Sequence, residues 1–103
     1  MPADDRKRAA HRALVETILS GPGRAAPDQR AAAFAGAGVD PAVQPLVDKV
    51  VTDPTQVSDA DFAAAKAAGL SEDQIFELVI AAAVGRSSRM YEAGLAALDE
   101  VSS

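Results

Sequence analysis

Apolar residues recur along the chain at helical spacing, and no segment shows the strict alternation that is typical of a strand. A first helix is predicted over about Asp4–Leu19, where one apolar stripe occupies positions i, i+3, i+4 and i+7: His11, Leu14, Val15 and Ile18. The segment Ser20–Gly23 ends this helix, because glycine permits a left-handed cap and proline cannot continue a helix. A second helix begins near Pro27, since proline suits a first helical turn.

Local capping signals predict where the next two helices begin. Asp40 is a good N-cap for the third helix, with Pro41 at its first position. Ser58, with Asp61 three residues later, predicts the start of the fourth helix as a capping box. Gly69 is expected to end that helix.

The fifth helix is the longest element that the pattern predicts. Ser71 and Gln74 form a second capping box at its start, and its helical pattern continues to about Asp99. Its first half, FELVIAAAVG, is almost purely apolar, whereas its second half, RSSRMYEAG, is rich in polar groups. With 103 residues the chain is long enough for one domain. We therefore expect a single all-α domain of about five helices with a long C-terminal helix.

Alanine dominates the hydrophobic content and limits the bulk of the core. Hydrophobic residues make up 49% of the chain, but aromatic residues only 4%. Alanine favours helix because it loses no side-chain entropy, and its small side chain lets helix axes approach closely. We therefore expect tight helix packing, with part of the core supplied by another subunit.

The charge and the residue types argue against several classes of function. A net charge of −5 disfavours nucleic-acid binding, which needs a basic face, and the basic run Arg6–Arg12 is predicted to be a solvated helix face. The chain has no cysteine, which removes disulfides, thiolate metal sites and thiol catalysis. The longest uncharged apolar run, Leu78–Gly85, is too short to span a bilayer. We expect a cytoplasmic protein with no cofactor, no metal and no membrane contact.

The order of segments from residue 24 onward resembles that of a known family. The run VDKVVTDPTQVSDADFAAAKAAGLSEDQIFELVIAAAVGRSSRMYEAGLAAL resembles the C-terminal part of AhpD-like proteins, in the alkylhydroperoxidase and carboxymuconolactone decarboxylase superfamily. The resemblance covers about Arg24–Leu98, so we divide the domain into an N-terminal helix and turn (1–23) and an AhpD-like region (24–99). It implies an AhpD-like helical bundle that assembles into dimers, trimers or hexamers.

The resemblance also indicates which chemistry is missing. Redox-active members reduce peroxides with a C-x-x-C pair followed by a histidine and supported by a glutamate, and a chain without cysteine cannot do this. Many relatives carry a pattern like F-N-x-x-N-R in the long helix. The matching residues here are Val84, Gly85, Arg86, Ser87, Ser88 and Arg89, and only Arg89 fits.

Arg86 and Arg89 are the first candidates for a binding site. They are three residues apart on one helix face. Two cations there need carboxylates from another helix or subunit, or a small anionic ligand. Surface positions or an interface ion pair are favoured over the ligand site. Tyr91 is a further candidate, although a tyrosine usually buries its ring and finds one partner for its hydroxyl.

His11 and Glu77 are weaker, catalytic candidates. Glu77 interrupts an apolar run, where burial could raise its pKa and make it an acid or base. The favoured alternative is an outward-facing residue, or a pair with Lys49 or Lys66. His11 is the only histidine, and it is favoured as a packed residue because one imidazole makes a poor metal site.

Three residues of the fifth helix are predicted to lie at an interface: Gly85, Met90 and Gly94. Glycine costs helix stability relative to alanine, so close approach of another helix, from this subunit or another, is the expected reason for it. The leading hypothesis is a non-enzymatic helical homo-oligomer that binds a partner protein or holds an assembly together. The alternative is a cofactor-free enzyme similar to carboxymuconolactone decarboxylase, or a binder of a small anionic ligand.

Overall fold

The computed structural model describes residues 2–102 and the side chains of residues 6–101, and within this part the chain forms helices and loops without a strand. A 3-10 turn, η1 (Pro54–Gln56), accompanies the α helices, which are α1 (Pro2–Ser20), α2 (Pro27–Ala35), α3 (Gln44–Thr52), α4 (Asp59–Ala67) and α5 (Glu72–Ser102). The prediction of an all-α chain with five helices is confirmed. The last helix is the longest, as expected, and continues three residues beyond the predicted Asp99.

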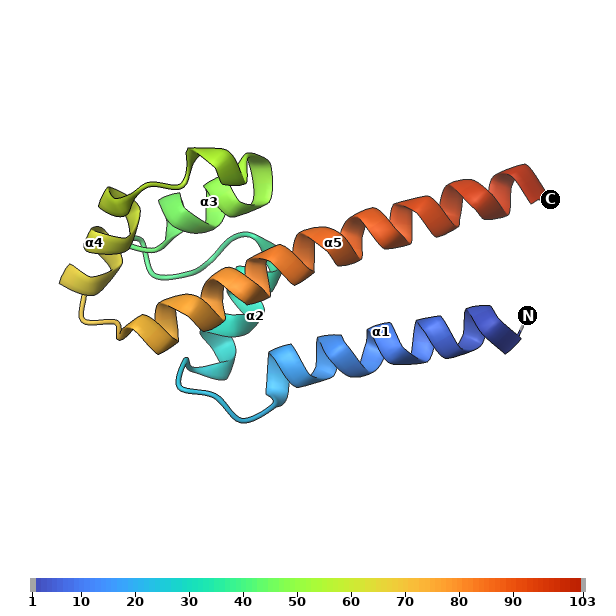
Figure 1. Cartoon of the computed structure of the whole chain (residues 1–103), viewed down its shortest axis with the longest axis horizontal. Coiled ribbons are helices and arrows are strands. Elements are labelled where there is room, and N and C mark those ends of the chain that lie inside the picture. The colour runs from blue at the N-terminus through green and yellow to red at the C-terminus, as the bar shows by residue number, and fades with distance from the viewer. Residues whose placement is uncertain (1, 103) are drawn as a thin grey trace.

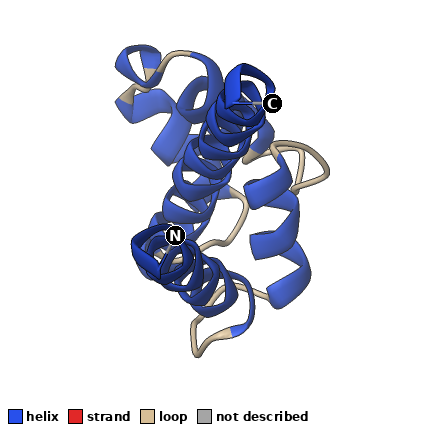
Figure 2. Ribbon diagram, turned by 90° about the vertical axis from the view of Figure 1, so that its right-hand side faces the viewer, coloured by secondary structure: helices blue, strands red, loops and turns tan. Residues whose placement is uncertain are grey.

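Helices α2, α3 and α4 surround the first half of α5, whereas α1 and the second half of α5 extend away from them side by side (Figure 1). We call α2, α3, α4 and the first half of α5 the head, and the two extended segments the arms. Seen along the long axis, α2 lies on one side of α5, α3 and α4 on another, and α1 along a third (Figure 2). The molecule measures 51 × 28 × 19 Å, so it is markedly elongated.

The two predicted capping boxes are present and fix the starts of α4 and α5. The Ser58 N–H donates to a carboxylate oxygen of Asp61 at 2.9 Å. The Ser71 N–H donates to the Gln74 side-chain oxygen at 2.8 Å, and the Gln74 N–H donates back to Ser71 Oγ at 3.1 Å. Gly69, at a φ of 99°, takes the left-handed conformation that ends α4.

Helix α3 begins at Gln44, so the prediction that it begins at Pro41 is wrong. Asp40 caps a preceding turn instead, and its side chain accepts a hydrogen bond from the Ala42 N–H at 2.9 Å. A helix that began at Pro41 would put Pro45 at its fifth position, where the proline ring clashes with the carbonyl four residues back. The later start places Pro45 in the first turn, where proline is tolerated.

The core confirms the expectation of close packing through small side chains. None of the three phenylalanines is buried: Phe34 is half-buried, and Phe62 and Phe76 are exposed. The buried apolar residues are instead mostly alanine and valine, namely Ala25, Ala33, Ala65, Ala81, Ala82, Val39, Val43, Val47 and Val50, with Leu46, Ile75 and Leu78. Such side chains fill a core only when the helices lie close together.

At Gly85 the backbone of α2 lies so close to α5 that no side chain fits between the two helices. A Cβ atom at position 85 would lie 2.7 Å from the carbonyl carbon of Phe34 and still closer to its oxygen. The obstacle is backbone, which cannot move aside as a flexible side chain can. The prediction that Gly85 permits close approach of another helix is therefore confirmed, and that helix belongs to the same chain.

A pair of identical substitutions in α5 tests this contact. We expect Gly85→Ala to lower the free energy of unfolding by roughly 1–3 kcal/mol, because the added methyl group overpacks the α2–α5 contact. At protein concentrations at which the chain is monomeric, Gly94→Ala should raise it by about 0.5–1 kcal/mol, because a Cβ there meets nothing of the same chain within 4 Å and glycine is a poor helix former. Urea unfolding followed by circular dichroism measures both, and equal effects at the two positions would contradict the close approach.

Candidate functional site

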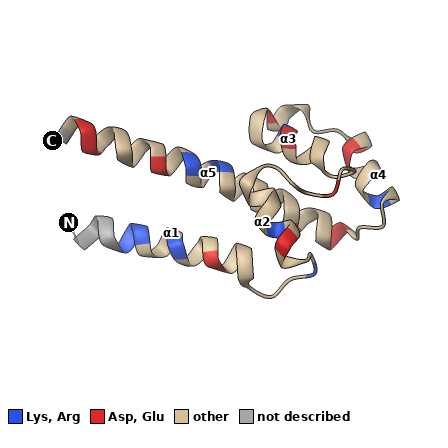
Figure 3. Ribbon diagram, turned by 180° about the vertical axis from the view of Figure 1, so that it is seen from behind, with Lys and Arg blue, Asp and Glu red and all other residues tan. Residues whose placement is uncertain are grey.

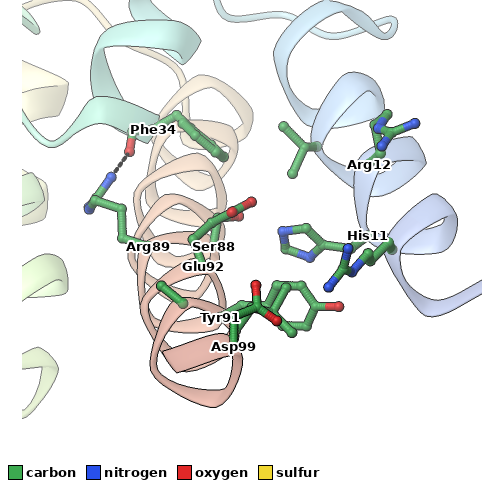
Figure 4. A pocket seen from close by; sticks show the side chains of 12 residues that line it. His11, Arg12, Phe34, Ser88, Arg89, Tyr91, Glu92 and Asp99 are labelled. Atoms are coloured by element: carbon green, nitrogen blue, oxygen red, sulfur yellow. Dashed lines mark hydrogen bonds between the residues drawn. The ribbon is translucent and has the colours of Figure 1, made fainter. Parts of the chain in front are cut away.

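A groove of about 720 Å³ lies between α1 and the second half of α5, with Phe34 of α2 at its inner end (Figure 4). We call it the α1–α5 groove. It exists because three residues of the stripe predicted on the first helix face α5: Ile18 packs against the core, whereas His11 and Val15 line the groove. The fourth, Leu14, is 49% exposed, so its predicted place in the packed stripe is wrong. The groove lies within the usual size range of small-molecule sites, but it is open along its length.

His11 and Tyr91 join the two arms across the groove. Their rings stack with centroids 4.8 Å apart and planes inclined by 27°. Both residues are half-buried. Such an aromatic pair contributes about 0.5–1.5 kcal/mol beyond the area it buries. The structure thus places His11 in a packing contact, the arrangement that the sequence analysis favoured over catalysis, and brings it together with Tyr91, which was not foreseen.

Ser88 is the most unusual polar residue of the groove. It is 7% exposed, and its hydroxyl has no hydrogen-bond partner among the described residues. An unpaired buried hydroxyl costs free energy, so such a group calls for an explanation. Ser88 was not predicted from the sequence, although its spacing from Ala81 and Gly85 places all three residues on the buried side of α5.

The two candidate arginines of α5 do not converge on one site. Arg89 lines the α1–α5 groove together with Tyr91, but its guanidinium donates a hydrogen bond to the carbonyl oxygen of Phe34 at 2.6 Å (Figure 4). Its guanidinium thus satisfies a carbonyl at the end of α2, where a cation also opposes the negative end of the helix dipole. Arg86 is half-buried and has no hydrogen bond or ion pair with any other described residue.

Charges of both signs line the groove. Arg8 and Arg12 come from α1, and Glu92 and Asp99 come from α5. Figure 3 shows the charges of the two arms, with basic and acidic residues along α1, and basic residues near the middle of α5 followed by acidic residues towards its C-terminal end. Opposite charges facing one another favour the pairing of the two arms, and they weaken the case for a site selective for anions.

Glu77 anchors the loop between α1 and α2. Its carboxylate accepts hydrogen bonds from the backbone N–H groups of Arg24 and Ala25. These bonds hold the pKa of Glu77 below its ordinary value, with the charges of Arg30 and Arg24 acting in the same direction. The possibility of a raised pKa is therefore wrong.

The two lysines suggested as partners of Glu77 pair elsewhere. Lys49 meets Asp61 at 3.0 Å, and Lys66 meets Glu72 at 2.7 Å. These ion pairs connect α3 to α4, and α4 to the start of α5. Glu77 therefore pairs with neither lysine and bonds to the backbone of the α1–α2 loop. Its ionised carboxylate is poorly suited to take part in proton transfer near neutral pH.

Arg30 fixes the other end of the same loop and was missed from the sequence. It is only 6% exposed, and it donates hydrogen bonds to the carbonyl oxygens of Ile18 at 3.3 Å and Gly21 at 2.7 Å. It thereby satisfies carbonyls at the end of α1 that lack intrahelical partners. The sequence offered a faint signal, since Arg30 is a charged residue in an alanine-rich helix and shares a face with Ala33.

The outward side of α5 carries a second candidate surface. We call it the outer stripe, and it consists of Phe76, Ile80, Ala83, Ser87, Met90, Gly94, Ala97 and Val101. All of these residues are exposed except the half-buried Ile80, and Phe76, Met90 and Val101 are 64%, 63% and 84% exposed. Two of the predicted interface residues, Met90 and Gly94, belong to it, whereas Gly85 faces α2.

Comparisons with known proteins found no matching family model, no matching curated protein and no matching solved structure. The AhpD-like assignment therefore stays a prediction.

Within the described residues, no cluster of three or more histidine, aspartate or glutamate side chains has an arrangement that could hold a metal ion. No helix of residues 2–102 combines the length and apolar character needed to cross a membrane.

The anchoring role of Glu77 predicts a pH-dependent stability. Its folded-state pKa lies below the ordinary value of 4.5, so the ionised form stabilises the fold above that pH, and the contribution is lost as the pH falls through the folded-state pKa. We expect Glu77→Gln to lower the free energy of unfolding by about 1–2 kcal/mol at neutral pH and to have little effect in acid. The measurement is urea unfolding across the acid range.

The matched control is Glu92→Gln, which removes a carboxylate from an exposed position on the same helix. This variant should change the free energy of unfolding by less than about 0.5 kcal/mol. An effect of Glu77→Gln that is the same at neutral and acid pH would contradict the role assigned to the ionised carboxylate.

Proposed function

We propose that this chain is a non-enzymatic helical module that assembles with other chains through the outer stripe of α5. The observation that carries the proposal is the concentration of exposed apolar side chains on that side. Six large hydrophobic residues are exposed among the side chains that the structure describes, and four of them belong to α5. Phe76, Met90 and Val101 lie on the outer stripe, and Leu98 lies beside it. Contiguous apolar surface on a folded chain typically marks a site of association.

The shape of the molecule supports association independently of any single residue. A compact chain of this length has a radius of gyration of about 13 Å, whereas the observed value is 15.3 Å. A monomer of 10.5 kDa typically exposes roughly 5,400 Å², and this chain exposes 6521 Å². The excess is comparable to the roughly 800 Å² that each partner buries in a standard interface.

The small side chains of the core give a physical reason why this chain exposes more surface than a compact monomer of its size. Alanine and valine bury little area each, and burial of apolar area is the main favourable term in folding. The arms lie outside the head, so they contribute little to its core. Pairing with another chain would bury more apolar area per residue in the arms. An assembly of this kind also agrees with the AhpD-like bundle that the sequence resembles.

We expect the purified protein to have a mass that is a multiple of 10.5 kDa in light scattering and to dissociate on dilution. Met90→Lys should weaken association at least about tenfold, because it removes a methionine that the interface would bury and places a charge there. Sedimentation velocity over a concentration series measures this change. A stable monomer at micromolar concentration would refute the proposal.

The control variant is Ala31→Lys, which adds the same charge at an exposed position of α2. It should leave the association constant within about a factor of two, because it lies on the head, away from the outer stripe. Circular dichroism of both variants should show unchanged helix content, since neither position is buried.

The buried hydroxyl of Ser88 is the observation that favours a second candidate function, the binding of a small anionic ligand in the α1–α5 groove, whereas the carboxylates of Glu92 and Asp99 in the same groove oppose it. Ser88 Oγ is enclosed in this structure, so a carboxylate would accept a hydrogen bond from it only after the groove had widened, with Arg12 of α1 supplying positive charge. The apolar part of such a ligand would meet Val15 and Leu95. This arrangement differs from the predicted site, since Arg86 takes no part and Arg89 is committed to Phe34.

Ser88→Ala separates the two functions. Without a ligand it should raise the free energy of unfolding by about 1 kcal/mol, because it removes an unpaired buried hydroxyl. Benzoate, as a simple aromatic carboxylate, should raise the melting temperature of the unaltered protein and have a smaller effect on Ser88→Ala. No shift with benzoate at millimolar concentration would count against the ligand function and leave the assembly function untouched.

A further inference from the structure

The outer stripe has the spacing of a coiled-coil seam. Its eight residues follow one another at intervals of four, three, four, three, four, three and four positions from Phe76 to Val101. Apolar residues at this alternating spacing keep one side of a helix facing a partner helix over many turns. The stripe lies opposite the residues of α5 that pack into the head, such as Leu78 and Ala82.

We propose that the outer stripe pairs with the outer stripe of a second copy of this chain, with the two α5 helices antiparallel. This inference rests on the proposed assembly function and adds the identity of the partner and the register. In this register Met90 of each copy lies against Gly94 of the other. Position 94 offers an open notch, because a Cβ placed there would meet nothing within 4 Å. A long flexible side chain thus fills a hole left by a glycine.

The neighbouring layers of the same register contain small side chains. Ser87 of each copy meets the second copy's Ala97, and Ala83 meets the second copy's Val101. Such layers pack without a large void when the two helix axes approach closely, as the α2 and α5 helices do within the chain. The helices overlap from Ala83 to Val101, a length of about 27 Å at 1.5 Å per residue, so this pairing covers six of the eight stripe residues and leaves Phe76 and Ile80 outside it.

The residues beside the stripe favour the same arrangement. On one flank Arg86 comes opposite the second copy's Glu100, and the twofold axis produces this pair twice. On the other flank Val84 comes opposite the second copy's Leu98, which is 61% exposed in the single chain. Arg86 is half-buried without a charged partner among the described residues. The pairing brings it to the carboxylate of Glu100, which also interacts within its own chain.

A parallel pair fits these residues less well. Parallel helices would place Met90 against Met90 and Gly94 against Gly94, so that one layer is crowded and another is empty. Arg86 would then lie level with the second copy's Arg86 and far along the helix from any Glu100. Both size and charge therefore favour the antiparallel arrangement.

Cysteine cross-linking tests the register directly, because the chain has no cysteine of its own. In the double variant Ser87→Cys/Ala97→Cys, each new thiol would face the other type of thiol across the pair. A short bismaleimide reagent should then give a covalent dimer on a denaturing gel in high yield. Within one copy the two thiols are about 15 Å apart along the helix, beyond the reach of the reagent.

The single variants and an off-stripe pair are the controls. Ser87→Cys alone and Ala97→Cys alone should give little dimer, because identical positions meet only in a parallel pair. Ser87→Cys/Ala96→Cys should also give little, since Ala96 lines the α1–α5 groove on the other side of α5. Efficient cross-linking of either single variant, or an absence of cross-linking in the Ser87/Ala97 variant, would overturn the antiparallel register.

The mass of the untreated protein, measured on the same samples, separates failure of this inference from failure of the proposed function. A monomer at every concentration refutes both. An oligomer whose Ser87/Ala97 variant keeps its mass but does not cross-link refutes the pairing of outer stripes and leaves the assembly function standing. An oligomer with efficient cross-linking in the double variant alone supports both.

Discussion

The contact between Gly85 and the Phe34 carbonyl sets the depth at which α2 lies against α5, and the rest of the head follows from that depth. Because no Cβ fits at position 85, the end of α2 comes within reach of Arg89, which satisfies the same carbonyl. The close approach also buries Ser88 one turn further along. A chain with few bulky residues obtains a packed core in this way, by bringing backbones together rather than by filling space with side chains.

Polar anchors hold the α1–α2 loop to this packed unit. Glu77 accepts hydrogen bonds from the backbone at the end of the loop, and Arg30 donates to carbonyls at its start. Both side chains come from helices of the head, so the loop and the end of α1 are held against it. Further along, α1 depends on weaker contacts, among them the ring stack of His11 on Tyr91. The stability of the arms should therefore be lower than that of the head.

The sequence predicted the elements well because their signals are local. Capping residues such as Ser58 and Ser71 act within one helical turn, so their effect does not depend on the tertiary structure. The start of α3 was misjudged because two prolines competed, and the cost of Pro45 inside a helix outweighed the cap at Asp40. The site was harder to predict. The roles of Glu77, Arg30 and Arg89 depend on backbone groups at least nine residues away in the chain, and no pattern of residue types reveals such partners.

Because α5 is one continuous helix, the α1–α5 groove and the outer stripe are two sides of the same rod. A rotation of this rod about its own axis would carry Tyr91 and Ser88 around as it moved Met90 and Gly94. The proposed ligand and the proposed second copy would therefore bind at separate surfaces. Binding of either one would still affect binding of the other if it rotated α5 about its axis. In thermodynamic terms the two binding events would be linked, and the strength of the linkage would depend on how firmly Gly85 and Phe34 hold the helix in place.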